Sequence, residues 1–276
     1  MQAIDYAKQA STSFVLPDIC IRIRQMLDDH HSDIDDIGNL VSLDPSLASK
    51  LLKLANSPLF RFRSQVDSIS KAINVLGGEA LYNLVMAETA KDAFQYFSDE
   101  NMDLTRFWQQ SLYTGLIAKH LAKLARVRGT ERFFLLGLLH NLAELVITKE
   151  NPDMAAKCLP TDETILPFVL QKKILGFTYA QCSSNILQLW QLPTQIWMPI
   201  EQINDENHAL GNKEIAIMNV ASVAGYLLAT QSSKKPEKTI NAEILKSVDM
   251  DADLLVDAIT FSKQEFNQML SIFSSN

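Results

Sequence analysis

Apolar side chains recur along most of the chain at spacings of three and four residues, which place them on one face of a helix. Asp44-Pro45 is a typical helix start, because the Asp side chain can accept from free backbone amides and Pro fits the first turn. The stripe Leu47, Leu51 and Leu54 follows, and Asn56-Ser57-Pro58 ends it. Alternating apolar runs joined by a tight turn, the pattern of paired strands, are absent. The sequence therefore predicts an all-α, multi-helix fold.

The other predicted helices show the same periodicity. Ser32 and Ser68 open two short helices, and a longer one follows Asp103. Thr130 is expected to cap the next helix, whose residues 133–139 are apolar on every face. Such a segment predicts a central helix that is buried all round. Further predicted helices cover about residues 79–97, 162–175, 179–190, 194–204, 213–230, 241–247 and 252–273.

Composition and charge narrow the class of protein. Of 276 residues, 47% are hydrophobic and 21% charged, which is ordinary for a globular protein. The net charge of −7 argues against a broad nucleic-acid surface, which needs clustered Lys and Arg. No apolar run approaches the ~20 residues of a membrane span, and no signal-peptide pattern is seen. Cys20, Cys158 and Cys182 are far apart and form no CxxC motif, so we expect reduced thiols and a cytoplasmic protein without nucleic-acid or membrane partners.

Several short motifs follow one another in a distinctive order. They are Leu16-Pro17, Asp44-Pro45-Ser46-Leu47, Leu54-Ala55-Asn56-Ser57, Ser68-Ile69, Ala72-Ile73, Leu76-Gly77, Trp108 with Ser111, Gly137-Leu138-Leu139-His140 and Trp190-Gln191-Leu192-Pro193. In this order and spacing, over about residues 14–205, the chain resembles the HDOD family, a helical regulatory branch of the HD-domain phosphohydrolase superfamily. The resemblance implies an HDOD domain over residues 1–210, with an N-terminal helical lobe at about 14–100 and an HD-like lobe at about 101–210. Residues 211–276 are expected to form helices that pack on the same bundle.

The resemblance also implies where metal ligands would stand in active relatives, whose His and Asp residues hold divalent metals that activate water for attack on phosphate. The Asp of the His-Asp pair is Asn141 here, and an expected His of the preceding long helix is Gln110. Three further ligand positions correspond to Gln171, Tyr179 and Asn204. Only His140 remains. Since a carboxamide brings no charge to offset a divalent cation, we expect no metal, no other cofactor and no catalytic residues.

The other histidines do not restore a ligand set. His30 and His31 lie in an acidic stretch and are interpreted as a solvated helix end. His120 stands between lysines and is expected at the surface, and His208 lies near Asn204 without a second imidazole close in sequence. His140 is then interpreted as a hydrogen-bonded core histidine.

Two classes of function remain open. The leading hypothesis is a non-catalytic regulatory module in a bacterial signalling pathway, which acts through a protein partner or a small ligand such as a nucleotide. Its candidate polar pocket comprises Gln110, His140, Asn141, Gln171, Tyr179 and Asn204. Either a small molecule binds in this pocket, or its polar groups form hydrogen bonds within the protein and with water. The rival hypothesis is a metal-dependent phosphohydrolase acting on nucleotides or cyclic dinucleotides, and a purely structural scaffold is a third possibility.

A candidate interaction surface surrounds the turn after residue 55. It comprises Lys50, Lys53, Phe60, Arg61 and Arg63, and the turn's Leu59 is a further candidate for exposure. A basic rim with an aromatic tip could dock an acidic protein or a phosphate. The alternative is that these cations only complement the negative end of a helix dipole.

Overall fold

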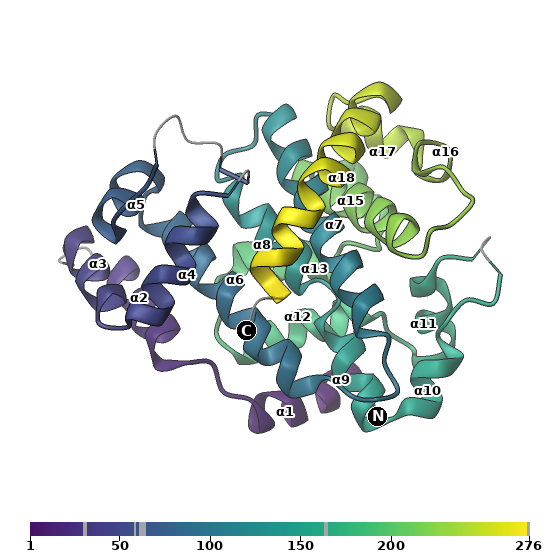
Figure 1. The fold of residues 1–276 in the computed structure, drawn as a ribbon. Coiled ribbons are helices and arrows are strands. Elements are labelled where there is room, and N and C mark those ends of the chain that lie inside the picture. The colour runs from purple at the N-terminus through teal and green to yellow at the C-terminus, as the bar shows by residue number, and fades with distance from the viewer. Residues whose placement is uncertain (30–31, 58, 61–64, 163–164, 275–276) are drawn as a thin grey trace. The chain divides into compact units, whose positions relative to one another are not determined.

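The computed structural model describes residues 1–29, 32–57, 59–60, 65–162 and 165–274 (Figure 1). Within these ranges the regular elements are helices and no strand occurs, so the all-α prediction is confirmed. The chain divides into two compact units. The larger unit comprises residues 1–15 and 94–266, and the smaller one comprises residues 16–93 and 267–276. The division into an HDOD domain of two lobes and separate C-terminal helices stays a prediction.

The smaller unit is built from short helices with well-defined caps. They are α2 (Asp18–Asp28), α3 (Ile34–Ser42), α4 (Pro45–Ala55), α5 (Ile69–Leu76), most of α6 (Gly78–Phe97) and the end of α18 (Ala252–Ser274). As predicted, Asp44 Oδ1 accepts from two backbone amides at the start of α4, and Ser68 Oγ accepts from the amide of Lys71, 3.2 Å away. The predicted start at Ser32 is one residue early, because the side chain of Asp33 caps α3.

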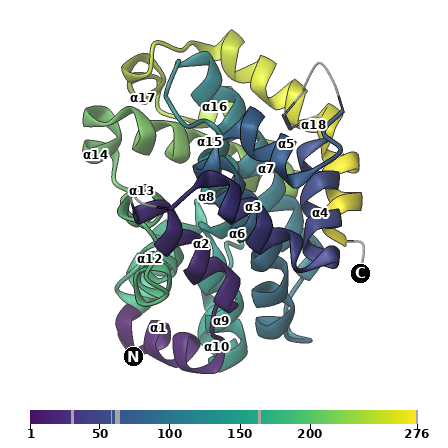
Figure 2. The same ribbon diagram turned by 90° about the vertical axis from the view of Figure 1, so that its left-hand side faces the viewer.

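The larger unit holds the remaining helices. They are α1 (Ala3–Ser13), α7 (Leu104–Leu124), α8 (Glu131–Leu139), α9 (Leu142–Glu150), α10 (Pro152–Lys157), α11 (Pro167–Leu175), α12 (Tyr179–Leu189), α13 (Thr194–Glu201), α14 (Glu206–Gly211), α15 (Lys213–Ala229), α16 (Pro236–Thr239), α17 (Ala242–Ser247) and most of α18. Helix α7 packs along α8 and α15, and α1 packs against α9 and α12 (Figure 2). The apolar side chains of residues 133–139 are at most 2% exposed, so α8 is the central buried helix that the sequence predicts.

Some predicted boundaries were wrong. Helix α11 begins at Pro167 and not near residue 162, because Pro fixes the backbone of the first turn there. Thr130 occupies the N-cap position of α8, but its side chain makes no capping hydrogen bond and donates to Glu131 instead. None of the described helices is long and apolar enough to cross a membrane.

Glycines allow α7, α8 and α15 to cross with their backbones in contact. A Cβ atom on Gly137 of α8 would lie 2.3 Å from the Cα atom of Gly115 in α7. A Cβ atom on Gly225 of α15 would lie 2.2 Å from Oγ1 of Thr114, also in α7. Because only glycine permits approaches this close, the crossing fixes the three helices that carry much of the site described next.

Candidate functional site

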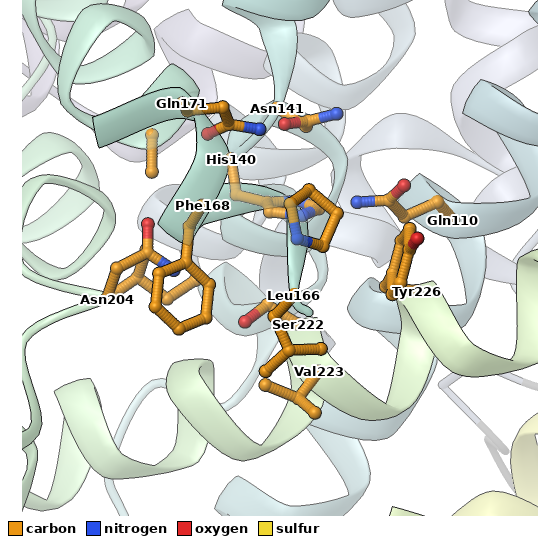
Figure 3. A pocket seen from close by; sticks show the side chains of 13 residues that line it. Gln110, His140, Asn141, Leu166, Phe168, Gln171, Asn204, Ser222, Val223 and Tyr226 are labelled. Carbon is orange, nitrogen blue, oxygen red and sulfur yellow. The ribbon is translucent and has the colours of Figure 1, made fainter. Parts of the chain in front are cut away.

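A small cavity opens among α7, the junction of α8 and α9, α11, α12 and α15 (Figure 3). Its volume is about 50 Å³. Five residues predicted for the polar pocket line it: Gln110, His140, Asn141, Gln171 and Asn204. Ser222 and Tyr226 of α15 add two polar groups that sequence reasoning missed, and apolar side chains such as Phe168 complete the wall. Residues more than 90 positions apart in sequence therefore share one cavity.

Tyr179, the sixth residue predicted for the pocket, is not part of the lining. Helix α12 presents the neighbouring Ala180 to the cavity, while Tyr179 is buried and its hydroxyl bonds to Cys158. The backbone N–H of Tyr179 still supports the site, because it donates to Oε1 of Gln171 over 2.9 Å. Burial, together with the charge of Glu144, raises the pKa of Tyr179, so its hydroxyl keeps its proton.

His140 ends α8 with its imidazole turned inward, and the residue is only 4% exposed. Its Nδ1 atom lies 2.7 Å from the carbonyl oxygen of Gly137. A carbonyl can only accept, so Nδ1 carries the proton. Burial lowers the pKa of His140 to about 4, and the ring is neutral at pH 7. Nε2 is then an unprotonated acceptor, and within the described part of the chain this buried atom has no hydrogen-bond partner.

A buried ion pair lies beside the cavity, and sequence reasoning missed it. Arg106 of α7 donates through Nη2 to Oε1 of Glu144 in α9, and through Nη1 to Oε1 of Gln110, 3.1 Å away. Asn141 donates through Nδ2 to the other carboxylate oxygen of Glu144. Desolvation lowers the pKa of Arg106, but the charge and the hydrogen bond of Glu144, together with the charge of Asp103, outweigh it and hold this pKa above its ordinary value. The spacing of Arg106 and Gln110, four residues apart on one helix, was the signal available in the sequence.

These contacts fix which end of each amide faces the cavity. Arg106 can only donate, so Gln110 gives it an oxygen and keeps its NH₂ group free for the cavity. The carboxylate of Glu144 can only accept, so Asn141 gives it the NH₂ group and keeps Oδ1. Gln171 accepts from a backbone N–H and keeps its NH₂ group. The side chains of Gln110, His140 and Asn141 converge on the cavity in Figure 3.

Comparison with known families identifies the family to which the chain belongs. The model of the HDOD domain matches residues 14–206, about seven-tenths of the sequence. The chain belongs to the HDOD domain family. Over 212 residues it is 30% identical to an uncharacterized protein of Treponema pallidum (strain Nichols), a match that covers 75% of the chain and 40% of that protein. The HDOD chain thus spans about two-fifths of the length of this relative.

Solved structures share the HDOD fold. An HDOD domain protein of unknown function from Geobacter sulfurreducens is 22% identical, with a TM-score of 0.73 and coverage of 98% of this chain and 97% of that one. A provisionally named phosphohydrolase from Shewanella amazonensis SB2B is also 22% identical, with a TM-score of 0.70 and coverage of 96% and 98%. A provisionally named signal transduction protein from Marinobacter aquaeolei VT8 is 20% identical, with a TM-score of 0.70 and coverage of 96% and 60%. At these identities the similarity establishes the fold.

The residues at the HDOD cavity do not fit a divalent metal. No carboxylate is among the described residues of the lining, and the nearby carboxylate of Glu144 is already bound by Arg106 and Asn141. No group of three or more His, Cys, Asp or Glu side chains arranged to hold a metal occurs in the described part of the chain. One imidazole and neutral amides cannot balance the charge of a hard cation, and a catalytic zinc usually needs three protein ligands.

His120 and His208 lie apart from the cavity lining. His120 is only partly exposed: its Nε2 atom lies 3.0 Å from Asp257, and its ring stacks on Phe261. His208 lies at the surface beside Asp205, 3.0 Å away. His30 and His31 lie outside the described residues.

The candidate interaction surface belongs to the smaller unit and is only partly described. Lys53 is exposed and Phe60 is half-buried, while Lys50 Nζ lies 3.7 Å from the buried Glu88 carboxylate. The expected exposure of Leu59 was wrong, since this residue is 6% exposed. The side chain of Asn56 bonds to both backbone groups of Val66, which ties the chain beyond Leu59 back to the end of α4. Two further members, Arg61 and Arg63, lie outside the described residues.

Proposed function

We propose that this HDOD chain is a non-catalytic regulatory module whose HD-type metal site is degenerate, and that it acts by binding a protein partner or a small ligand. The Arg106–Glu144 ion pair is the observation that carries this proposal. It uses the carboxylate of Glu144, which also accepts from Asn141, for an internal charge balance. That carboxylate is therefore not available to a metal.

The energetics of the pair support the same conclusion. A divalent cation that recruited Glu144 would have to displace the guanidinium of Arg106 from a buried site. Removing one partner of a buried ion pair costs about 3–5 kcal/mol, because it leaves an uncompensated charge. The amides of Gln110 and Asn141 would repay little of that cost, since neutral oxygens bind hard cations weakly.

A regulatory module also needs an output surface. We propose the exposed Lys53, with Lys50 and Phe60, as part of the surface that meets an acidic protein partner in a signalling pathway. The carboxylate of Glu88 partly neutralises the charge of Lys50. Lys53 would therefore contribute more than Lys50 to a contact with an acidic partner. The expected test result is weaker partner binding for Lys53→Glu than for Lys50→Glu.

Metal-dependent hydrolysis is the second candidate function, and one observation favours it. The Nε2 atom of His140 is an unprotonated nitrogen without a partner, which is the state that a metal ligand requires. This reading requires stoichiometric metal and a phosphatase activity on nucleotides or cyclic dinucleotides, both lost when His140 is replaced.

Elemental analysis of the full chain after incubation with Mn, Fe or Zn decides between the two functions. His140→Gln is the test variant, and His208→Gln, which alters an exposed imidazole, is its matched control. We expect only traces of metal in all three proteins and no hydrolysis of phosphomonoesters or cyclic dinucleotides. One or two metals per chain, lost in His140→Gln but retained in His208→Gln, would establish a hydrolase instead.

A further inference from the structure

Surrounding contacts determine the donor or acceptor identity of four of the seven polar groups that the described lining of the cavity contains. Two acceptors face it, Nε2 of His140 and Oδ1 of Asn141. Two donors face it, the NH₂ groups of Gln110 and Gln171. The described lining residues carry no formal charge at pH 7. The pattern is therefore complementary to a neutral group that both donates and accepts.

The Nε2 atom of His140 is the acceptor for which a donor has to be found. The residue is 4% exposed, and its buried Nε2 atom has no hydrogen-bond partner among the residues that the structure describes. Buried polar atoms in native proteins are nearly always paired with protein or with ordered water. The tautomer cannot change to relieve the problem, because Nδ1–H is held by the carbonyl of Gly137 at 2.7 Å. A bound group must therefore bring its own N–H or O–H to this nitrogen.

We propose that the cavity is a binding site for a small neutral molecule bearing an amide group, whose N–H donates to His140 and Asn141 and whose carbonyl accepts from Gln110 or Gln171. An amide supplies two donors and one acceptor within a few heavy atoms. The inference rests on the proposed function, since a metal on Nε2 of His140 would occupy the same lone pair.

The size of the cavity selects a small group. Its volume of about 50 Å³ is far below the roughly 300–1,000 Å³ of ordinary ligand pockets. It has room for a group of a few heavy atoms and not for a whole nucleotide. A wider cleft of about 580 Å³ shares Phe168 and Asn204 with the cavity, so the rest of a larger amide could extend there.

The absence of charge excludes an anion as the preferred occupant. No Lys or Arg is among the described lining residues, and the guanidinium of Arg106 is committed to Glu144 and Gln110. A carboxylate or phosphate would meet the bare lone pair of His140 and the oxygen of Asn141 without a compensating cation. Burying an unpaired charge is strongly unfavourable, whereas a neutral amide makes the same contacts without that cost.

A pair of probes of nearly equal size tests the proposal on the unaltered full chain. Acetamide is neutral, and acetate is its anionic counterpart at pH 7.5. The readout is the ¹⁵N resonance of His140 Nε2 in protein with labelled histidine, assigned by its loss in His140→Gln. His208→Gln serves as the control that leaves this resonance in place. Acetate titrations are matched in ionic strength with sodium chloride.

We expect acetamide to shift the Nε2 resonance in a saturable manner, with about tenfold tighter binding than acetate, because only the neutral probe avoids burying a charge. Binding in the millimolar range is what four heavy atoms support. In Ala180→Val, which adds bulk to the cavity wall, the acetamide shift is expected to be lost. A resonance that stays unchanged with both probes, as for a cavity filled by ordered water, would overturn the proposal. Stronger binding of acetate would overturn it as well.

The failure of this inference can be told apart from failure of the proposed function. If acetamide has no effect and the protein takes up no metal, the amide site is wrong while a non-catalytic module stands. If Mn, Fe or Zn binds stoichiometrically and shifts or broadens the His140 resonance, the proposed function itself is wrong. Both results are read on the unaltered protein, and the variants serve to assign the resonance and to control the readout.

Discussion

Arg106 of α7 and Glu144 of α9 stand 38 residues apart in sequence and form an ion pair from which water is largely excluded. The pair ties the helix that carries Gln110 to the helix that follows His140 and Asn141. It therefore holds the polar side of the cavity in place, and it also decides which atoms of Gln110 and Asn141 remain free. The Arg106–Glu144 pair thus determines both the charge balance beside the cavity and the polar atoms that face into it.

Arg106→Met is expected to lower the free energy of unfolding by about 3 kcal/mol, because it leaves the carboxylate of Glu144 buried without its counter-ion. Urea denaturation at pH 7 measures the change. The double variant Arg106→Met/Glu144→Gln should recover part of the loss, since the remaining group is neutral and still accepts from Asn141. Equal stability of the single and double variants would contradict a buried, charged Glu144.

The burial of neutral His140 predicts a specific pH dependence of stability. Its pKa is about 4 in the folded protein and about 6.5 in an unfolded chain. Between these values the unfolded state binds more protons, so stability falls as pH drops from about 6.5 to 4. The loss attributable to this residue is about 3 kcal/mol. Urea unfolding of wild type and His140→Gln from pH 4.5 to 7 should show a shallower pH slope in the variant, and an unchanged slope would refute the assignment.

Gly137→Ala is expected to destabilise the protein by at least about 3 kcal/mol or to prevent folding, because the new Cβ atom would overlap the backbone of Gly115 at 2.3 Å. Gly211→Ala is the matched control. No atom lies within 4 Å of its Cβ position, so the change should be neutral or slightly stabilising. Thermal unfolding of the two variants measures the contrast. Similar melting temperatures would show that α7 and α8 can separate without cost.

Asn141→Asp, which rewrites the sequence as a His-Asp pair, is expected to destabilise the protein rather than to create a metal site. The new carboxylate would face Glu144 in place of a donor, so one hydrogen bond is replaced by repulsion between like charges. The expected loss is about 2 kcal/mol in unfolding by urea. A large stabilisation of this variant by Mn or Zn, absent from wild type, would show that the site needs only one substitution to bind metal.

Much of the fold could be predicted from the sequence. The Asp44 and Ser68 caps, the buried α8 and the periods of α7, α15 and α18 were readable because their signals are local: a capping side chain, or a stripe repeated over several turns. Helices α1, α2, α9, α10, α14 and α16 were missed. Of these, α10, α14 and α16 have at most six residues, too few to show a repeated stripe. Leu59 was misjudged because a contact such as the one between Asn56 and Val66, ten residues apart, leaves no local pattern in the sequence.

The cavity was predicted in part, and the reason differs from residue to residue. Gln110, His140, Asn141, Gln171 and Asn204 came from the resemblance to a family, which fixes positions in a motif. Tyr179 does not line the cavity. Neighbouring residues on a helix point about 100° apart, and Ala180 faces the cavity instead. Arg106 and Glu144 were overlooked because pairing across 38 residues depends on how α7 meets α9, which their identities alone do not reveal.

Glycines, and not the polar side chains that line the cavity, allow α7, α8 and α15 to cross. Since Gly115, Gly137 and Gly225 bring these helices together through backbone contact, the frame does not depend on which polar groups project from it nearby. Ligating side chains can then be exchanged for amides over evolutionary time while the scaffold persists. The same property makes the cavity a suitable place to install new recognition by design, with Gln110, Gln171 and Asn204 as the positions to vary.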